Sequence, residues 1–451
     1  MQIFINGKKS SYNQILDESP PIQTARSYWG KDQLFNKSAI DLRILLTLPL
    51  GSISLVYGPR QIGKTASLRI FLSRVSDCET LLFTDCSSVT DRRDLYSHLN
   101  ELLQGPTTVI LDEVQSVPEW HLALRALHGE GKLSQCRVVC TGSEARYLLE
   151  SGERLPGRKG AGKNIFARPW SFREYVDFFY REEASPFQNL SMKHLTSTWL
   201  TEQPPRLQQA WNEYSRYGGI PRAVAEFRKI GNVSDETYSI YFDWILGIWS
   251  RLRTPERSLR MLCKRIVETM NSRVTFEALK KNTDIQSANT VRTLIEMLED
   301  HFALNILPRM DPQTHKFLPA KMKKVYPLDP FIAQVFRALG DNKRRMIDSN
   351  VSSTGTDECA FNAQTYRYEK DLNVAFLYSD RTHCEIDFWI DSTAFELKSE
   401  GKPTKGQQEL LKSCEHHFLV NREKIPIVAY LLGEGRNNDW TTEKGRCQNE
   451  Y

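Results

Sequence analysis

The chain has 451 residues, 40% of them hydrophobic, and a formal net charge of +5 at pH 7, which predicts about three ordinary globular domains. No apolar stretch approaches the roughly 18 residues that span a bilayer, and the N-terminus lacks the apolar segment of a signal peptide, which argues against a membrane protein. Nine cysteines without a C-x-x-C pair give no zinc or disulfide framework, so we expect a protein of the reducing cytoplasm.

The first element with a clear chemical meaning is a strand followed by a glycine-rich loop and a helix. The apolar run 53–57 leads into a complete G-x-x-x-x-G-K-[ST] pattern, and a helical segment, 66–75, follows. Backbone N–H groups of such a loop wrap phosphates, and the helix N-terminus adds partial positive charge. The sequence therefore predicts an ATP site formed by Gly58, Pro59, Arg60, Gln61, Ile62, Gly63, Lys64, Thr65 and Ala66.

A second half of this site follows about fifty residues later. The β-branched run 107–111 ends in Asp112 and Glu113, which is typical of a buried parallel strand that carries acids at its carboxyl end. Lys64 would reach the β and γ phosphates, while Thr65 and Asp112 would hold Mg²⁺. Glu113 is the natural general base for the attacking water. The acid pair indicates ATP hydrolysis rather than binding alone.

Three further runs have the same character, at 80–84, 137–141 and 164–167, with helical stretches such as 120–128 between them. Strands that alternate with helices predict an α/β fold with a parallel sheet, whose ligands bind at the carboxyl ends of the strands. Every polar group named above lies at such an end.

The order of these motifs is specific. The phosphate loop is followed by residues 111–115, 141–143, 156–158 and 169–174. In this order they resemble the prokaryotic AAA+ ATPases that carry a winged helix and a PD-(D/E)xK restriction-nuclease-like C-terminal domain. The resemblance implies a strand order of 5-1-4-3-2 and a γ-phosphate sensor at Ser143, where mainstream AAA+ proteins have Asn. It also implies an N-terminal extension (1–43), an AAA+ core (44–210), a helical lid (211–255), a winged helix (256–340) and an α/β restriction-endonuclease-like domain (341–451).

Two further residues of the nucleotide site depend on this resemblance. Arg158, in a loop rich in glycine and cations, is a candidate to stabilise the transferring phosphoryl group. A solvated basic loop is the alternative, and Arg168 and Arg173 compete for the role. Pro221, in the run 217–221, is similar to the lid element that packs against adenine.

A basic segment follows. Residues 251–324 contain fifteen Lys or Arg against eight Asp or Glu, a net charge of +7, so the remainder carries −2. Such asymmetry is typical of nucleic-acid contact. We expect a helix near 275–279, a second after 283–290 and a hairpin of 302–307 with 316–318, which together make a winged helix. Its recognition helix would present Gln286, Ser287, Asn289 and Arg292. A protein-docking role for this module stays open.

The C-terminal part has a second cluster of acids. Two strand-like runs, 384–390 and 394–398, carry Asp387, Glu396 and Lys398, and residues two apart on a strand share a face. These positions resemble the PD-(D/E)xK core, in which Asp387 and Glu396 would hold Mg²⁺ and Lys398 would assist catalysis. The upstream helical acid would be Glu358 or Glu369.

Together these observations predict a cytoplasmic ATPase that binds DNA and couples its nucleotide state to a nuclease-like domain, in defence or mobile-element biology. The alternative is an ATP-controlled DNA- or protein-binding switch whose nuclease-like domain is catalytically silent. We expect ATP and Mg²⁺ as cofactors, DNA as a partner, a homo-oligomer or partner protein as a further possibility, and no membrane contact.

Overall fold

The structure is a computed structural model that describes residues 3–11, 14, 23, 40, 42–75, 79–144, 157, 159–190, 205–250, 254–318, 321–346, 353–365, 374–390, 392–398 and 402–433. Within these residues, no helix combines the length and apolar character needed to cross a membrane. Arg158 and Glu369 lie outside the described residues.

The N-terminal half contains a seven-stranded sheet in the order β2-β1-β4-β5-β6-β3-β7. All five expected strands are present and pair in parallel. In chain order they lie in the sequence 5-1-4-3-2, so the expected strand order is confirmed. Their bounds are Ser52–Tyr57 (β3), Thr80–Asp85 (β4), Thr107–Asp112 (β5), Cys136–Gly142 (β6) and Asn164–Phe166 (β7).

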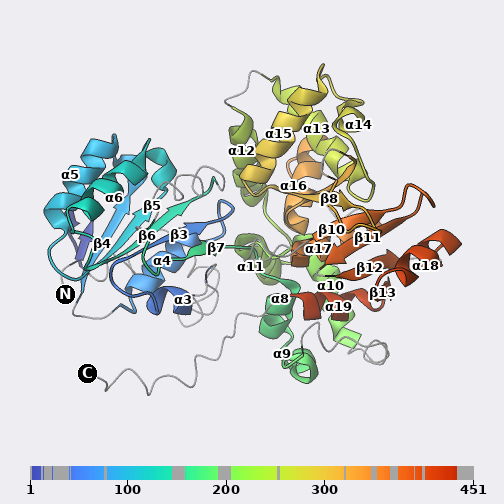
Figure 1. The fold of residues 1–451 in the computed structure, drawn as a ribbon, viewed down its shortest axis with the longest axis horizontal. Coiled ribbons are helices and arrows are strands. Elements are labelled where there is room, and N and C mark those ends of the chain that lie inside the picture. Colours follow the sequence, from blue (N-terminus) through green and yellow to red (C-terminus); the bar gives the residue numbers. More distant parts are fainter. Residues whose placement is uncertain are drawn as a thin grey trace.

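Helices cover both faces of this sheet (Figure 1). α3 (Leu42–Leu46) and α4 (Lys64–Leu72) bury leucines and Phe71 against one face. α5 (Arg92–Leu102) and α6 (Trp120–Gly129) pack Leu95, Leu99 and Trp120 against the other. Because the strands are buried on both faces, apolar residues follow one another along their middle parts, which is why they read as continuous runs.

An N-terminal hairpin extends the sheet at one edge. β1 (Ile3–Ile5) pairs in parallel with β4, and β2 (Lys8–Lys9) pairs with β1 in antiparallel. Part of the region expected to be a mere extension therefore belongs to the sheet.

The C-terminal half begins with helices and continues into a second sheet, on the right in Figure 1. Its first helices are α8 (Phe172–Phe179), α9 (Arg181–Ala184), α10 (Pro205–Tyr217), α11 (Pro221–Ile230) and α12 (Asp235–Trp249). α10 crosses the boundary expected between residues 210 and 211. Three helices and a hairpin follow: α13 (Glu256–Thr269), α14 (Phe276–Lys280), α15 (Ala288–Asp300), β8 (Leu304–Met310) and β9 (Lys323–Pro327).

The hairpin differs from expectation in its second strand. Phe317 makes only an isolated bridge to Met310, and the strand that pairs with β8 along its length is β9, which starts at Lys323. The expectation of a return strand at 316–318 was wrong. The strand that returns, β9, begins with two lysines, and such charged residues do not predict the buried strand that the sheet forms there.

The second sheet has six strands in the order β13-β12-β11-β10-β8-β9. The hairpin β8–β9 is thus continuous with the strands of the expected nuclease-like region, through the parallel pairing of β8 with β10. The remaining elements are α16 (Pro330–Gly340), α17 (Ser353–Thr365), β10 (Val374–Tyr378), β11 (Glu385–Ile390), β12 (Thr393–Lys398), α18 (Lys405–Lys412), β13 (His416–Asn421) and α19 (Ile425–Leu432).

One hydrophobic core joins these elements. It runs from Trp170 to Leu432 and includes side chains of α8, α10, α13, α16, α17 and α19. The C-terminal α19 returns to α8, where the hydroxyl of Tyr430 donates to Oδ1 of Asp177 at 2.6 Å. The expected lid, winged helix and nuclease-like regions therefore share a core.

Candidate functional site

The phosphate loop connects β3 to α4 in a geometry that needs glycine. A Cβ on Gly58 would lie 2.0 Å from the carbonyl oxygen of Ala167, so no side chain fits where the loop leaves the sheet. Gly63 has a φ of +90° and precedes α4, a conformation that glycine adopts without strain. The loop is therefore shaped by its two glycines.

Lys64 turns back into this loop. Its Nζ donates to the carbonyl oxygens of Gly58 at 3.0 Å and Pro59 at 2.8 Å. Burial lowers the pKa of the ammonium, while Glu113 and Asp112 act in the opposite direction. The ammonium therefore lies against the backbone of the phosphate loop.

Thr65 and Asp112 form the pair expected to hold Mg²⁺. The Thr65 hydroxyl donates to Oδ2 of Asp112 at 2.7 Å, and the Thr141 hydroxyl donates to Oδ1 at 2.5 Å. Burial raises the pKa of Asp112, whereas the two hydroxyl donors lower it. A hydroxyl and a carboxylate side by side are hard oxygen donors that suit Mg²⁺, so these residues fit the cation.

Glu113 and Ser143 also come together. The Ser143 hydroxyl donates to Oε2 of Glu113 at 3.4 Å, and Gln115 Nε2 donates to the same carboxylate and to Ser143 Oγ, the latter at 3.2 Å. Arg60 Nε donates to Ser143 Oγ at 3.1 Å. Ser143 therefore connects the phosphate loop with the acid expected to act as base.

The other candidates of the nucleotide site have different surroundings. Arg168 pairs with Glu174 at 3.7 Å. Arg173 donates to the carbonyl of Leu190 and lies 4.9 Å above the ring of Tyr430, so its guanidinium is held between α8 and α19. Pro221 starts α11, and its role beside adenine stays a prediction.

The comparisons agree with this geometry. Residues 51–176 match the family model described as "AAA domain". The N-terminal sheet unit is a P-loop AAA+ core. This fold implies that the unit binds a nucleotide, typically with Mg²⁺, and that it is an ATPase. A second model, described as "Domain of unknown function (DUF8612)", matches residues 208–343, from α10 to the end of α16.

Solved structures are more distant from the chain. Cdc6p from Pyrobaculum aerophilum is 13% identical, with 70% of this chain and 94% of that chain covered and a TM-score of 0.25. A point mutant of RuvB from Thermotoga maritima is 17% identical, covering 60% and 92%, with a TM-score of 0.32. Similarity this low supports no statement about function. No curated protein matches the chain.

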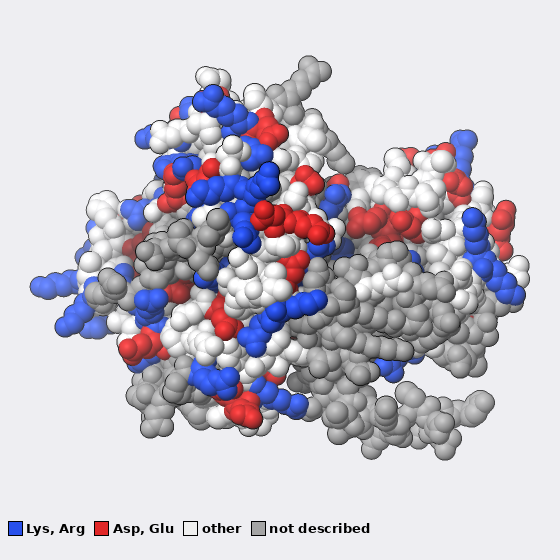
Figure 2. Space-filling model, turned by 180° about the vertical axis from the view of Figure 1, so that it is seen from behind, with Lys and Arg blue, Asp and Glu red and all other residues white. Residues whose placement is uncertain are grey.

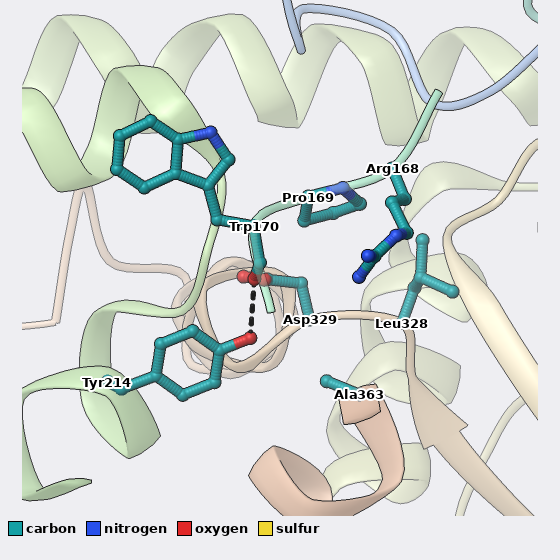
Figure 3. Close-up of a pocket in the computed structure, with 7 residues that line it drawn as sticks. All are labelled: Arg168, Pro169, Trp170, Tyr214, Leu328, Asp329 and Ala363. Carbon is teal, nitrogen blue, oxygen red and sulfur yellow. Dashed lines mark hydrogen bonds between the residues drawn. The ribbon is translucent and has the colours of Figure 1, made fainter. Parts of the chain in front are cut away.

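The AAA+ core meets the C-terminal half at a small buried cavity (Figure 3). It measures about 10 Å³ and is lined by Arg168, Pro169, Trp170, Tyr214, Leu328, Asp329 and Ala363. This volume holds at most one water, so the cavity is a packing junction and not a ligand site. Tyr214 donates to the carbonyl of Trp170 at 2.7 Å, and Asp329 accepts from Gly219 N–H at 2.8 Å.

A much larger cleft lies in the C-terminal half, with a volume of about 880 Å³. Asp387 from β11 and Glu396 and Lys398 from β12 all line it. Lys398 Nζ lies 2.7 Å from Oε1 of Glu396, so the two side chains share a face, as their spacing indicated. The structure thus brings the three candidate residues to one place.

The upstream acid of this cleft is Glu358, on α17. Burial, together with the charge of Asp387, raises the pKa of its carboxyl to about 8, and Lys324 opposes the shift. Burial and Asp387 likewise raise the pKa of Glu396 to about 7. Burial and the neighbouring negative charges therefore favour the protonated form of both acids.

The arrangement of the cleft does not fit a metal ion. Asp387 Oδ1 accepts from Lys324 Nζ at 2.9 Å and Oδ2 from Leu397 N–H at 2.9 Å. Glu396 Oε1 accepts from Lys398 and, at 2.6 Å, from Gln407. Across the part of the chain that the structure describes, no group of three or more His, Cys, Asp or Glu side chains is set to hold a metal. The carboxylates have the right chemistry, but the protein's own donors occupy them.

Three residues of these sites were missed from the sequence. Gln115 follows Glu113 by two positions, and its place within a family motif was the available signal. Gln407 lies on α18 and gave no local signal. Lys324 was counted among the cations of the basic segment, but its side chain is 0% exposed, because acids from β11 and α17 neutralise it.

Proposed function

We propose that this chain is an ATP-hydrolysing AAA+ protein that acts on DNA and couples its nucleotide state to a nuclease-like C-terminal domain. The observation that carries the proposal is the convergence of acids and a lysine from three separate elements on one large cleft. They are Glu358 of α17, Asp387 of β11, and Glu396 and Lys398 of β12.

DNA as the substrate is supported by the helices and hairpin next to the cleft. Three helices followed by an antiparallel hairpin have the order of a winged helix, with α15 in the position of a recognition helix. Gln286 and the N-cap residue Ser287 precede this helix, Asn289 and Arg292 lie on it, and all four are exposed. These side chains would meet base edges and phosphates without rearrangement of the core.

The basic charge of this segment is partly compensated. Arg292 pairs with Glu296 at 2.7 Å and Lys280 with Glu277 at 2.6 Å. Figure 2 shows basic and acidic side chains interspersed on the face seen from behind. We therefore infer a footprint of a few phosphates, with affinity that falls moderately with salt. A homo-oligomer or partner protein stays a prediction.

Coupling between the two halves is supported by contacts at their junction. Phe166, in the last strand of the AAA+ sheet, packs with Leu328, which directly follows β9. Phe172 N–H donates to Oε1 of Gln364 at 2.7 Å, and Gln364 lies on α17, the helix that carries Glu358. A shift of the AAA+ sheet would thus be transmitted to α17, which carries the cleft acid Glu358, and to β9, whose Lys324 contacts Asp387 behind the cleft.

The test is a cleavage assay on plasmid and linear DNA, with Mg²⁺ or Mn²⁺ and with or without ATP. We expect cleavage that depends on the nucleotide, is lost in Asp387→Ala and in Lys64→Ala, and persists in the control Glu409→Gln, an exposed acid of α18. Asp387→Ala should keep its ATP turnover. Cleavage that survives Asp387→Ala would refute the assignment of the cleft.

A second function is favoured by one observation. Because Lys324 and backbone donors already bind the carboxylates of the cleft, the domain would also serve as a catalytically silent part of an ATP-controlled DNA-binding switch. Under this alternative, the wild-type chain cleaves DNA in none of the conditions of the assay, while its affinity for DNA changes with ATP.

A further inference from the structure

The most unusual charge in the molecule is the ammonium group of Lys324. The side chain projects from β9 into the acid cluster, and it is 0% exposed. Its Nζ lies 2.8 Å from Oε1 of Glu385, 2.9 Å from Oδ1 of Asp387 and 3.6 Å from Oε2 of Glu358. Three carboxylates from two separate elements thus surround one cation.

This environment is built and not incidental. Tyr326, two residues further along β9, donates its hydroxyl to Oε2 of Glu358 at 2.9 Å. Arg273 donates to the other oxygen of Glu385 at 3.0 Å. Asp387, the third acid, accepts from the Leu397 N–H with its second oxygen. Each acid around Lys324 therefore has a second partner that fixes its direction, and a buried ammonium needs such complete pairing to be tolerated.

A divalent cation in the cleft would need the same oxygens. Mg²⁺ or Mn²⁺ takes carboxylate oxygens at about 2.0–2.2 Å, and Asp387 is the acid that both the ammonium and the ion would use. Two cations a few ångströms apart in a buried site repel each other strongly. The carboxylate of Asp387 can therefore serve the ammonium of Lys324 or a metal ion, but not both.

We infer that the ammonium of Lys324 takes the place of a metal ion among these acids and keeps a divalent ion from binding at Asp387. This inference rests on the proposed function, since it treats the cleft as a site of metal-assisted chemistry. It also explains why the carboxylates converge without forming an open metal site.

β9 is the element that positions this cation. It is the last strand of the six-stranded sheet and pairs with β8 alone, apart from a bridge between Lys323 and Val274. Its C-terminal end leads to Leu328, which packs on Phe166 of the AAA+ sheet. The strand that carries the competing cation thus leads directly to a residue in contact with the ATPase core.

The experiment measures Mn²⁺ binding to the full-length chain by isothermal titration calorimetry, without nucleotide. Lys324→Met keeps the length of the side chain and removes its charge. We expect this variant to bind one Mn²⁺ about tenfold or more tightly than wild type, because Coulomb repulsion from the ammonium is gone. The added site should disappear in Lys324→Met/Asp387→Asn, which separates it from any binding at Asp112.

Lys323→Met is the matched control. Lys323 precedes Lys324 on β9, and its Nζ lies 4.0 Å above the ring of Phe276, with Glu296 and Glu299 as its acidic neighbours in place of the cluster around Lys324. It should bind Mn²⁺ as wild type does. If Lys324→Met is not stable enough to purify, the double variant Lys324→Met/Glu385→Gln is used in its place. It removes one acid together with the cation, and its Mn²⁺ binding is measured in the same way.

Two results would overturn the inference. One is wild-type protein that binds Mn²⁺ at an Asp387-dependent site as tightly as Lys324→Met does, and the other is the absence of a gained site in both Lys324 variants. The DNA-cleavage assay on the wild-type chain is read separately. If the wild-type chain cleaves DNA and binds Mn²⁺ as tightly as Lys324→Met does, the role of Lys324 is refuted and the proposed function stands. If Lys324→Met gains an Mn²⁺ site but no variant cleaves DNA, the role of Lys324 stands and the proposed function is refuted.

Discussion

The hydroxyl of Ser143 donates a 3.4 Å hydrogen bond to Oε2 of Glu113, joining the ends of β6 and β5. Gln115 contacts both side chains, and Arg60 of the phosphate loop contacts Ser143. The acid expected to activate water is therefore linked to the loop expected to hold the γ-phosphate. Such a link would place the base in register with the bound phosphate chain.

This geometry predicts the effect of Glu113→Gln. The amide keeps the shape of the side chain but cannot accept a proton, so ATP hydrolysis should fall by about 10²-fold or more, while ATP affinity stays within a few-fold. A steady-state phosphate-release assay and a fluorescent-nucleotide titration measure the two quantities. Glu119→Gln, an exposed acid that pairs with Arg92, is the control, and hydrolysis by Glu113→Gln at the wild-type rate would remove Glu113 as the base.

The AAA+ core could be predicted from sequence because its information is local. Residues 52–57 and 107–112 form buried strands that are rich in apolar residues and lead into a glycine loop or an acid pair. One short stretch of sequence therefore shows both the strand and its chemistry. The hairpin Ile3–Ile5 with Lys8–Lys9 could not be predicted in this way. Its strands are too short for a periodic pattern, and pairing with β4 alone makes them part of the sheet.

The C-terminal half was predictable only in part, because its site depends on long-range contacts. The spacing of Glu396 and Lys398 placed them on one face correctly. Nothing near Lys324, however, indicates burial, since the acids that stabilise it come from β11 and α17, more than thirty residues away. A lysine pair at the start of a strand is usually solvated, and only tertiary structure reverses that expectation.

DNA binding should depend on the cations at α14 and α15. Each phosphate neutralised adds about 0.9 to the slope of log affinity against log salt. Reversing charge at Lys280, Lys281 and Arg292 together should weaken binding and flatten that slope. Since Lys280 and Arg292 are paired with Glu277 and Glu296, we expect exposed Lys281 to contribute the largest single share. Fluorescence anisotropy at several salt concentrations measures both effects.

The control for this experiment reverses three exposed cations of the AAA+ core, Arg93, Arg125 and Lys132. They lie on the side of the sheet that α5 and α6 cover, so duplex affinity and salt slope should stay at the wild-type values. An unchanged slope in the variant of α14 and α15 would instead assign this module to protein docking.

Asp329 should make stability depend on pH. Burial raises the pKa of its carboxyl to about 7, while N–H donors from Gly219 and Phe331 lower it. With the folded pKa above the unfolded value, the native state binds the extra proton between about pH 4 and 7. Stability from this group is thus complete below pH 4 and is lost as pH rises to 7, by up to about 4 kcal/mol.

Unfolding by urea at a series of pH values tests this sign. Asp329→Asn should flatten the decline in unfolding free energy between pH 4 and 7, although the loss of one acceptor lowers stability at every pH. Asp311→Asn is the control, because N–H donation from Thr314 lowers the pKa of Asp311 and confines its effect to pH values below about 4. A wild-type profile that rises over pH 4 to 7 and an unaltered slope in Asp329→Asn would contradict the prediction.

The cluster around Lys324 should be strongly coupled in stability. Lys324→Ala leaves the buried carboxylates of Glu358 and Asp387 without their shared cation, which costs about 3–5 kcal/mol in comparable sites. Asp387→Asn alone removes one of the acids and leaves the ammonium with Glu385. In the double variant the two losses should partly cancel, because the charges of Lys324 and Asp387 are removed together and neither is left without the other.

The expected coupling energy between Lys324→Ala and Asp387→Asn is about 1–3 kcal/mol, measured by urea unfolding of wild type, the two single variants and the double variant. Lys323→Ala, on the same strand but over the Phe276 ring, should cost less than Lys324→Ala. Strict additivity of the two substitutions would mean that the 2.9 Å contact between these residues contributes nothing to the fold, and that the cation is held by Glu385 and Glu358 instead.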